Sequence, residues 1–319
     1  MFSKLNTIFK KKSKRYYFLQ AVCFVALLFL CDFLLGKTLQ KLYYRQSSGW
    51  EWRTITAVEN IKADIMIFGA SRAQQQYNPT YIEDSLNKTC FNVGRDGMPI
   101  FYHYAILKSI LKRHTPQVII LDCEYGVLKK AESSYERLSC LLPFYKGHPE
   151  MQDIIALRGP YEKYKLWSYT YPYNSLLFKI AMGNIKSQKK RIVDIKGYVP
   201  LYNVLDEPIK TIDYSKEYEL DSVKINILKL FIDDCKKQQV KLFLACSPYY
   251  NISIDTDYSI KIIKEITKEK NIEFLDYTKE KIFLQNSKLF DDTVHVNTTG
   301  SKIFSSMVAS DLKKRLLSK

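Results

Sequence analysis

The 319-residue sequence lacks the patterns that mark several classes of protein. It has no internal repeat, no low-complexity segment and no nucleic-acid-binding motif, so nucleic acid is not expected as a partner. Its seven cysteines show no metal-ligand spacing, and no disulfide framework can be assigned from them. A single Asp-x-x-His without a second cluster of ligands makes a poor metal site, so we expect no metal and no other cofactor.

The formal charge of +16 is unevenly distributed. Residues 1–45 hold nine lysines and arginines against one acid, which places half of the excess charge on this segment. The other half makes the remainder of the chain moderately basic. Such a charge suits an anionic glycan or a membrane surface, and it is weak support for either.

An apolar segment near the N-terminus predicts a membrane anchor. Phe18 to Leu35 is interrupted by Gln20 and Asp32, and it is just long enough to cross a bilayer core, which takes about 20 residues. A basic cluster precedes it, so we expect a single-pass protein with its N-terminus in the cytoplasm and the rest outside. A cleaved signal peptide is the alternative, but no Ala-x-Ala-like site follows. Three N-terminal segments result: a cytoplasmic tail at 1–16, an anchor at 17–36 and a polar, aromatic stalk at 37–60.

A short strand followed by a serine is the expected centre of the site. Ile65 to Phe68 has the unbroken apolarity of a central parallel strand, Gly69 frees the backbone to turn, and Ser71 follows at once. In an open α/β sheet ligands bind outside the carboxyl ends of the strands, where Ser71 would lie. Taken alone, the stretch is better explained as a tight turn with Ser71 as a helix cap.

A second motif, near the other end of the chain, favours a catalytic serine. Asp292 and His295 are three residues apart in an expected loop before a helix, where one turn can present both side chains to the same pocket. Histidine is scarce, and no other of the four histidines has an acid at this spacing in such a loop. A serine nucleophile needs a base, and the base needs an orienting carboxylate. His295 and Asp292 meet both needs.

Together these motifs resemble the SGNH (GDSL-like) hydrolase superfamily, whose serine follows the first strand and whose Asp-x-x-His precedes the C-terminal helix. The second block of that family resembles the segment from Phe91 to Gly97, and the resemblance implies that Gly97 is the oxyanion-hole glycine. It covers about residues 60–125 and 240–319. In overall organisation the chain is similar to membrane-anchored members that modify O-acyl groups of bacterial envelope polysaccharides.

Two departures from the family pattern affect the expected chemistry. Gly-Ala-Ser replaces Gly-Asp-Ser, and the segment from Leu121 to Gly126 stands where the family has Gly-x-Asn-Asp, so the oxyanion-hole asparagine is missing. Loss of one oxyanion donor costs about 2.7–4 kcal/mol in other enzymes. Either Tyr125, Asn92 or Arg72 replaces it, or the enzyme is slow, or it is specialised for an acceptor other than water.

The remainder of the chain alternates between apolar strands and amphipathic helices. Strands are expected at 64–69, 90–93, 118–121, 240–246 and 272–275. This alternation predicts a flavodoxin-like three-layer α/β/α sandwich with a parallel sheet of about five strands, within a domain at 61–319. An insertion at 126–218 is rich in tyrosine. We expect a lid that selects the substrate, although single tyrosines more often pack inside a fold.

The expected function is that of a membrane-anchored serine esterase or acyltransferase acting on acetyl-like O-acyl groups of an extracytoplasmic polysaccharide. Ser71 is the expected nucleophile, His295 the base and Asp292 its orienting acid, with the backbone N–H groups of Ser71 and Gly97 as the oxyanion hole. The expected partners are the acylated polysaccharide or acyl donor, the membrane and a membrane-bound O-acyltransferase. The alternative is a catalytically inactive SGNH-like scaffold or glycan-binding protein, which the altered second and third blocks favour and the intact Ser71, Asp292 and His295 disfavour.

Overall fold

The structure is a computed structural model that describes residues 14–185, 194–206, 212–213, 218–250, 252–253 and 257–317. Most of the predicted cytoplasmic tail, and parts of the predicted insertion, lie outside the described residues.

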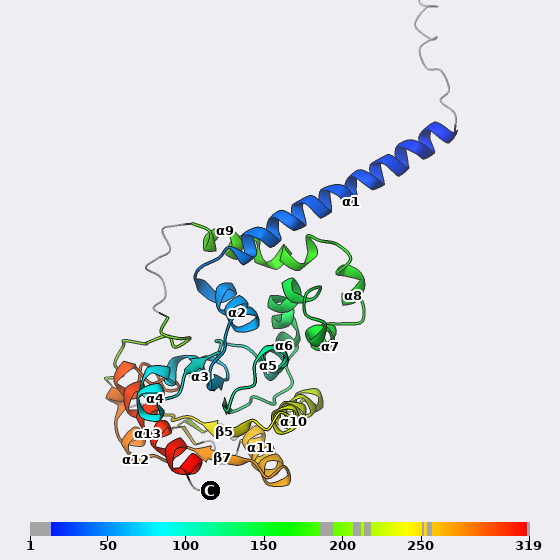
Figure 1. The fold of residues 1–319 in the computed structure, drawn as a ribbon. Helices are drawn as coiled ribbons and strands as arrows, with labels where there is room; N and C mark the ends of the chain where they lie inside the picture. The colour runs from blue at the N-terminus through cyan, green and yellow to red at the C-terminus, as the bar shows by residue number, and fades with distance from the viewer. Residues whose placement is uncertain are drawn as a thin grey trace, which may run out of the picture.

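Five parallel strands form the centre of the molecule (Figure 1). They are β1 (Ile65–Phe68), β2 (Cys90–Asn92), β3 (Val118–Asp122), β5 (Lys241–Cys246) and β7 (Glu273–Asp276), in the order β2-β1-β3-β5-β7. In the register, Ile65 lies between Cys90 and Val118. The predicted sheet is confirmed. Its order places β1, the strand before Ser71, beside β3, so the chain segments that follow these two strands lie next to each other.

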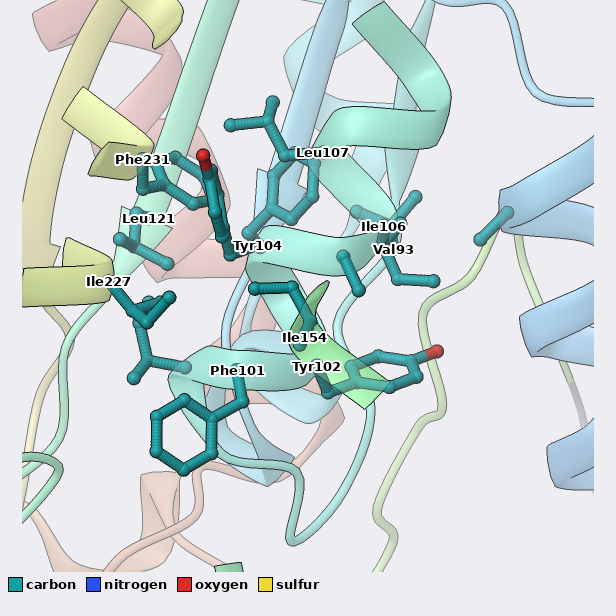
Figure 2. Close-up of a cluster of buried hydrophobic side chains, with 14 of the residues drawn as sticks. Val93, Phe101, Tyr102, Tyr104, Ile106, Leu107, Leu121, Ile154, Ile227 and Phe231 are labelled. Atoms are coloured by element: carbon teal, nitrogen blue, oxygen red, sulfur yellow. The ribbon is translucent and has the colours of Figure 1, made fainter. Parts of the chain in front are cut away.

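Helices cover both faces of the sheet, which explains why β1 is apolar along its whole length. Met66 and Phe68 face one apolar cluster, whereas Ile65 and Ile67 face the other. The first face carries α5 (Ile100–Arg113), α10 (Ser222–Lys237) and α11 (Tyr258–Glu269). Figure 2 shows part of this cluster, where Phe101 and Leu107 of α5 lie near Leu121 of β3 and Phe231 of α10.

The opposite face carries the elements that hold the serine and histidine motifs. They are α3 (Ser71–Gln76), α4 (Pro79–Leu86), α12 (Lys281–Leu284), the 3₁₀ turn η5 (Ser287–Leu289) and α13 (Thr298–Leu317). α13 contacts both α3 and α4, and Phe304 of α13 packs on Tyr77 directly after α3. The three-layer α/β/α sandwich is thus confirmed. The packing of α13 on α3 brings the two ends of the domain together.

The N-terminal region departs from its prediction. α1 (Lys14–Tyr44) is one helix, long and apolar enough to cross a membrane. The predicted stalk at 37–60 is instead part of the folded domain, because the last turns of α1 and all of α2 (Gly49–Glu59) pack onto it (Figure 1). Tyr43 and Val58 are fully buried, and Ser109 of α5 donates a hydrogen bond to the carbonyl of Val58. Tyr43, one of the aromatic residues of the predicted stalk, is therefore a core residue.

The insertion consists of short helices. They are α6 (Glu132–Glu136), η1 (Arg137–Phe144), η2 (Pro149–Met151), α7 (Gln152–Ala156), α8 (Glu162–Lys165), η3 (Tyr171–Leu176) and α9 (Leu177–Gly183). η1, η2 and α7 contact α5, while η3 and α9 contact α1. Two-residue strands β4 (Ile212–Asp213) and β6 (Ile252–Ser253) pair with each other. Most of the described insertion therefore fills the space between α5 and α1.

Candidate active site

Ser71 is presented at the carboxyl end of β1 by a turn that requires glycine. Gly69 has φ +138°, a region that favours glycine, and a Cβ there would lie 2.8 Å from the Cβ of Ala73 and 2.9 Å from the carbonyl of Asp122. α3 begins at Ser71, so the side chain leaves the sheet at the start of a helix. No capping hydrogen bond involves the side chain of residue 70, and the Ser71 hydroxyl is directed to His295 instead.

Ser71, His295 and Asp292 form one hydrogen-bonded chain. Nε2 of His295 lies 2.8 Å from Oγ of Ser71, and Nδ1 lies 2.9 Å from Oδ2 of Asp292. A carboxylate only accepts, so Nδ1 carries the proton and Nε2 is left as the acceptor for the serine hydroxyl. Ser71 and His295 are 224 residues apart in the sequence. The structure therefore places all three in the geometry that a nucleophile, a base and an orienting acid need.

The Asp292 carboxylate is held by the loop that carries it. Oδ1 accepts hydrogen bonds from the backbone N–H groups of Val294 and His295, both at 2.8 Å. Partial burial raises the pKa of Asp292, but the hydrogen bonds from the His295 ring and from these two N–H groups outweigh it and the net pKa is lowered. Asp292 is thus ionised beside the imidazole. Its side chain is 51% exposed.

Neighbouring side chains fix this loop to the rest of the site. Asn297 donates to the carbonyl of Lys288 at 2.8 Å, and its Oδ1 accepts from the first N–H groups of α13. Gln76 of α3 donates to the carbonyl of Val294 at 2.8 Å. Asp291, the neighbour of Asp292, turns away from the histidine and accepts from the backbone N–H of Asn203. The two adjacent aspartates therefore have different partners.

The loop with Gly97 lies against the start of α3. The backbone N–H of Arg95 donates to the carbonyl of Gly69 at 3.0 Å, and that of Asp96 donates to Oε1 of Gln74 at 3.0 Å. Gly97 has φ +65°, and a Cβ there would collide with Nη1 of Arg137. The two residues before Gly97 are therefore tied to Gly69 and to α3, the helix that begins at Ser71, and a guanidinium lies over Gly97 itself.

A buried ion pair joins this loop to α2. Nη2 of Arg95 lies 3.1 Å from Oε1 of Glu51, and both side chains are almost fully buried. The other guanidinium arm of Arg95 contacts Oγ1 of Thr54. A buried charge is tolerated only with a partner, so α2 is required for the position of Arg95. The segment predicted as a stalk thus supports one side of the site.

Two of the three residues predicted to replace the missing asparagine have other roles. Arg72 is fully buried, donates to Ser247 Oγ at 2.8 Å and stacks 3.3 Å from the ring centre of Tyr249. Asn92 is also buried; its amide donates to the carbonyls of Ala73 and Tyr77. Both amide hydrogens of Asn92 are thus used on backbone carbonyls, so this side chain has no donor left for a ligand. Arg72 is directed to Ser247 and Tyr249, while its Nε and Nη1 have no partner among the described residues, so its role at the oxyanion stays a prediction.

Tyr125, the third of these residues, follows β3 and is half-buried. Its backbone N–H donates to the hydroxyl of Tyr249 at 3.1 Å, and the two rings lie 6.1 Å apart. The structure thus fixes its backbone next to the Arg72 network. Its proposed role in supporting an oxyanion stays a prediction.

Sequence reasoning missed Asp122 as a support of the site. The carboxylate at the end of β3 accepts from Tyr77 Oη at 2.7 Å and from the backbone N–H and Oγ of Ser247, both at 3.0 Å. Burial raises the pKa of Asp122, although Arg72 and these hydrogen bonds oppose the rise. An acid at the carboxyl end of a buried strand was the available signal. Asp122 ties β1, β3 and β5 together beneath Ser71.

Arg137 was missed as well, because it lies 66 residues from Ser71 in the middle of the insertion. It is exposed at the first position of η1, with its guanidinium over Gly97. No spacing rule connects it to the serine motif. Only the folding of η1 against the Gly97 loop reveals a cation at this position.

A small cavity of about 20 Å³, with room for about one water-sized group, lies next to Gly69 and Ala70, the residues before Ser71. It is lined by Gly69 and Ala70, by apolar residues of α5, α10 and α11, and by Glu124 and His103. Burial raises the pKa of Glu124, which also interacts electrostatically with His295. His103 donates from Nε2 to the carbonyl of Met98 at 3.2 Å, and its Nδ1 has no partner among the described residues. The cavity is thus largely apolar, with Asp122, Glu124 and His103 as its polar side chains.

Among the described residues, no group of three or more His, Cys, Asp or Glu side chains is placed to hold a metal ion. The described cysteines are all unpaired, and those at positions 90, 123, 140, 235 and 246 are buried.

No protein-family model and no curated protein matches the chain. Similar folds are found among solved structures. The esterase EstA from Pseudoalteromonas sp. is 11% identical, with a TM-score of 0.41 over 79% of this chain and 97% of that one. The acetyl xylan esterase AlAXEase is 14% identical, with a TM-score of 0.39 over 79% of this chain and 100% of that one. A GDSL-like lipase from Bacteroides thetaiotaomicron is 8% identical, with a TM-score of 0.37 over 88% and 98%.

By name, these solved structures are two esterases and a GDSL-like lipase. Their identities of 8–14% and TM-scores of 0.37–0.41 carry no argument about activity or substrate. The residues of the site have to supply that argument.

Proposed function

We propose that this protein is a membrane-anchored serine esterase or acyltransferase that acts on acetyl-like O-acyl groups of an extracytoplasmic polysaccharide. One observation carries the proposal: an unbroken hydrogen-bonded path runs from Oγ of Ser71 through both ring nitrogens of His295 to Asp292. A serine that only caps a helix would direct its oxygen to backbone N–H groups. Ser71 directs it to an imidazole that is already oriented by a carboxylate.

The chemistry follows from these three side chains. Oγ of Ser71 attacks the ester carbonyl carbon while Nε2 of His295 takes the hydroxyl proton, and Asp292 stabilises the resulting imidazolium. Collapse of the tetrahedral intermediate breaks the ester C–O bond. His295 then returns its proton to the leaving alkoxide, and the acyl group remains on Ser71. In the second half His295 deprotonates water or a sugar hydroxyl as its oxygen attacks the acyl carbon. The bond between that carbon and Oγ of Ser71 then breaks, and His295 returns the proton to Oγ, which restores the free serine.

The oxyanion has three donors in this proposal. The backbone N–H groups of Ser71 and Gly97 supply two, as the family resemblance implies. Arg137 supplies the third in place of the missing asparagine, since its guanidinium lies over Gly97 and is not buried in an ion pair. A positive donor suits the negative charge that develops on the carbonyl oxygen. The insertion would thus complete the catalytic site.

The small cavity beside Gly69 and Ala70 is the place that we assign to the end of the acyl group, and its volume of about 20 Å³ has room only for a group as small as a methyl. It opens beside Ala70, the residue before the nucleophile, and its walls from α5, α10 and α11 are largely apolar. These walls suit a methyl group, while Glu124 and the unpartnered Nδ1 of His103 offer polar contacts at the far side. A sugar would then remain outside, on the exposed side of Asp292 and Arg137.

The location and partners extend the proposal beyond the site. α1 is long and apolar enough to cross a membrane, and the basic residues before it favour a cytoplasmic N-terminus. The domain would then face envelope glycans. A membrane-bound O-acyltransferase is the partner that we propose as the source of the acyl group. Ser71 would either receive that acyl group and pass it to the polysaccharide, or remove it from the polysaccharide by hydrolysis.

A serine-directed fluorophosphonate tests the proposal directly. The full-length protein in detergent should be labelled once, at Ser71, and labelling should be lost in Ser71→Ala and strongly reduced in His295→Ala. Incubation with an activated acetate ester, with and without an oligosaccharide acceptor, then separates hydrolysis from transfer. A folded wild-type protein that takes no label would contradict the enzyme and leave the scaffold function.

A further inference from the structure

An aromatic surface is exposed on the insertion near α1. It has two parts, one on either side of the base of α1 (Figure 1): Tyr161, Tyr164 and Trp167 in or next to α8, and Leu177 and Phe178 in α9. The side chains of Trp167 and Phe178 are each 76% exposed, and that of Tyr161 is 70% exposed. Large apolar side chains scattered singly are normal on a protein surface, but a group of them marks an interaction site.

This surface is fixed to α1 at one level of the helix. Asp32 of α1 accepts hydrogen bonds from Ser168 Oγ at 2.7 Å, from the backbone N–H of Tyr169 at 2.6 Å and from Thr170 Oγ1 at 2.6 Å. Phe33 packs edge-on against Tyr169, with ring centres 5.0 Å apart. In Figure 1, α8 and α9 lie on either side of the base of α1. Trp167, directly before Ser168, is therefore held at the level of Asp32.

The hydrogen bonds of Asp32 also indicate where a membrane would end on α1. From residue 16 to residue 31 the side chains of the helix are exposed, and Gln20 is the one polar side chain among them. These sixteen helical residues span about 24 Å, a large part of a bilayer core of about 30 Å. Asp32 is the first polar residue after this stretch, and its charge is satisfied by the insertion. The interface between hydrocarbon and headgroups would thus fall at Asp32, level with Trp167.

Lysines lie among these aromatic residues. An open groove of about 560 Å³ is lined by Tyr145, Lys146, Lys163, Tyr164, Leu166, Trp167 and Tyr169. Nζ of Lys146 lies 3.4 Å from the ring centre of Tyr169, and Lys37 of α1 lies on the same ring at 6.0 Å. Tryptophan, tyrosine and lysine side chains together are typical of protein segments at the membrane–water interface.

We propose that the aromatic surface rests on the lipid bilayer next to α1, with the rings among the headgroups and Lys146 and Lys163 facing lipid phosphates. The proposal depends on α1 crossing the membrane and is independent of the catalytic function. It gives the domain one fixed orientation instead of free rotation about a tether. The continuity of the surface with the lipid-facing part of α1 favours the bilayer as its occupant over a second protein.

Tryptophan fluorescence can test this contact, because the chain has only Trp50, Trp52 and Trp167. Full-length protein with Trp50→Phe and Trp52→Phe, reconstituted in phosphatidylcholine–phosphatidylglycerol vesicles, reports on Trp167 alone. Its emission should be blue-shifted, and lipids brominated near the headgroup should quench it by about half, because interfacial side chains sit about 5–10 Å deep. Lipids brominated near the chain ends should quench it less.

Matched variants keep the test decisive. The control variant carries Leu317→Trp at the exposed end of α13, far from α1 (Figure 1), together with Trp50→Phe, Trp52→Phe and Trp167→Phe. The emission of its single tryptophan should stay unquenched. Lys163→Glu should weaken the quenching of Trp167, whereas Lys313→Glu on α13 should leave it unchanged. Trp167 emission typical of water, with no quenching by either lipid, would overturn the bilayer contact and leave the surface to a protein partner. Circular dichroism checks that each variant is folded.

Discussion

The two sides of Ser71 are built in different ways. On one side, His295 and Asp292 come from a single loop, contact each other at 2.9 Å, and leave Asp292 half-exposed. On the other side, the Gly97 loop is positioned by side chains from α2, α3 and η1, including a buried ion pair. The contact between His295 and Asp292 thus joins residues three positions apart and forms in a partly solvent-exposed loop. The oxyanion side depends on tertiary packing, so a single lost contact there affects folding as well as chemistry.

The largest effect is expected on the histidine side. Ser71→Ala and His295→Ala should each lower the esterase or transferase rate by about 10⁴-fold or more, and the double variant should be hardly worse, because residues that act as one unit are not additive. Initial rates on an activated acetate ester measure this. Additive losses in the double variant would contradict a shared role.

The adjacent aspartates supply the internal control for that side. Asp292→Asn should reduce the rate less than either of the first two variants, since Asp292 orients the imidazole without moving the proton itself. Asp291→Ala should stay near wild type in rate, because its carboxylate binds Asn203 and not the histidine. Equal losses in the two aspartate variants would contradict the register seen in the structure.

The second effect, on the oxyanion side, is a loss of stability. Glu51→Gln leaves the buried charge of Arg95 without a carboxylate partner, which should lower the free energy of unfolding by about 3–5 kcal/mol. Glu269→Gln, which breaks an exposed ion pair with Lys229, should cost less than about 1 kcal/mol. Chemical denaturation in detergent measures both. Equal costs would mean that α2 does not support the Gly97 loop.

The third effect concerns the charge over Gly97. Arg137→Ala should lower kcat by about 10²–10³-fold with little change in KM, because an oxyanion donor acts mainly in the transition state. Arg137→Lys should retain part of the rate. Arg158→Ala is the control, since this arginine of the same insertion pairs with Glu162 away from Gly97. A rise in KM alone would make Arg137 a substrate-binding residue instead.

The smallest effect concerns the pH dependence of stability. Burial lowers the pKa of His103 to about 4, from 6.5 in the unfolded chain. Between these values the unfolded chain binds a proton that the folded chain does not, so stability falls as the pH is lowered through this window. At pH 5 the loss should be about 2 kcal/mol relative to neutral pH. His103→Asn should remove this part of the slope in thermal unfolding measured from pH 7 to pH 5. An unchanged slope would place His103 in contact with solvent.

Much of the α/β framework could be predicted because its signals are local. Ile65 to Phe68 is apolar on both faces because helices cover both faces of β1, and the turn at Gly69 follows from the backbone that only glycine adopts easily. The Asp292–His295 spacing fits one loop, so their contact was also predictable. The segment predicted as a stalk is folded because α2 packs on α5. No local pattern in the sequence identifies α5 as the partner of α2.

The strands, their order along the chain and the pairing of Asp292 with His295 can be predicted from local sequence, since each depends on residues a few positions apart. Which polar side chains are free to act depends on how the chain packs. Arg72 and Asn92 stand next to the expected site in sequence, yet both are buried and donate to backbone carbonyls or buried side chains. Arg137 stands 66 residues from Ser71 and reaches Gly97 because η1 folds against that loop. A buried polar group must find its partners inside the fold, and which partners are near is a property of packing that sequence spacing does not contain.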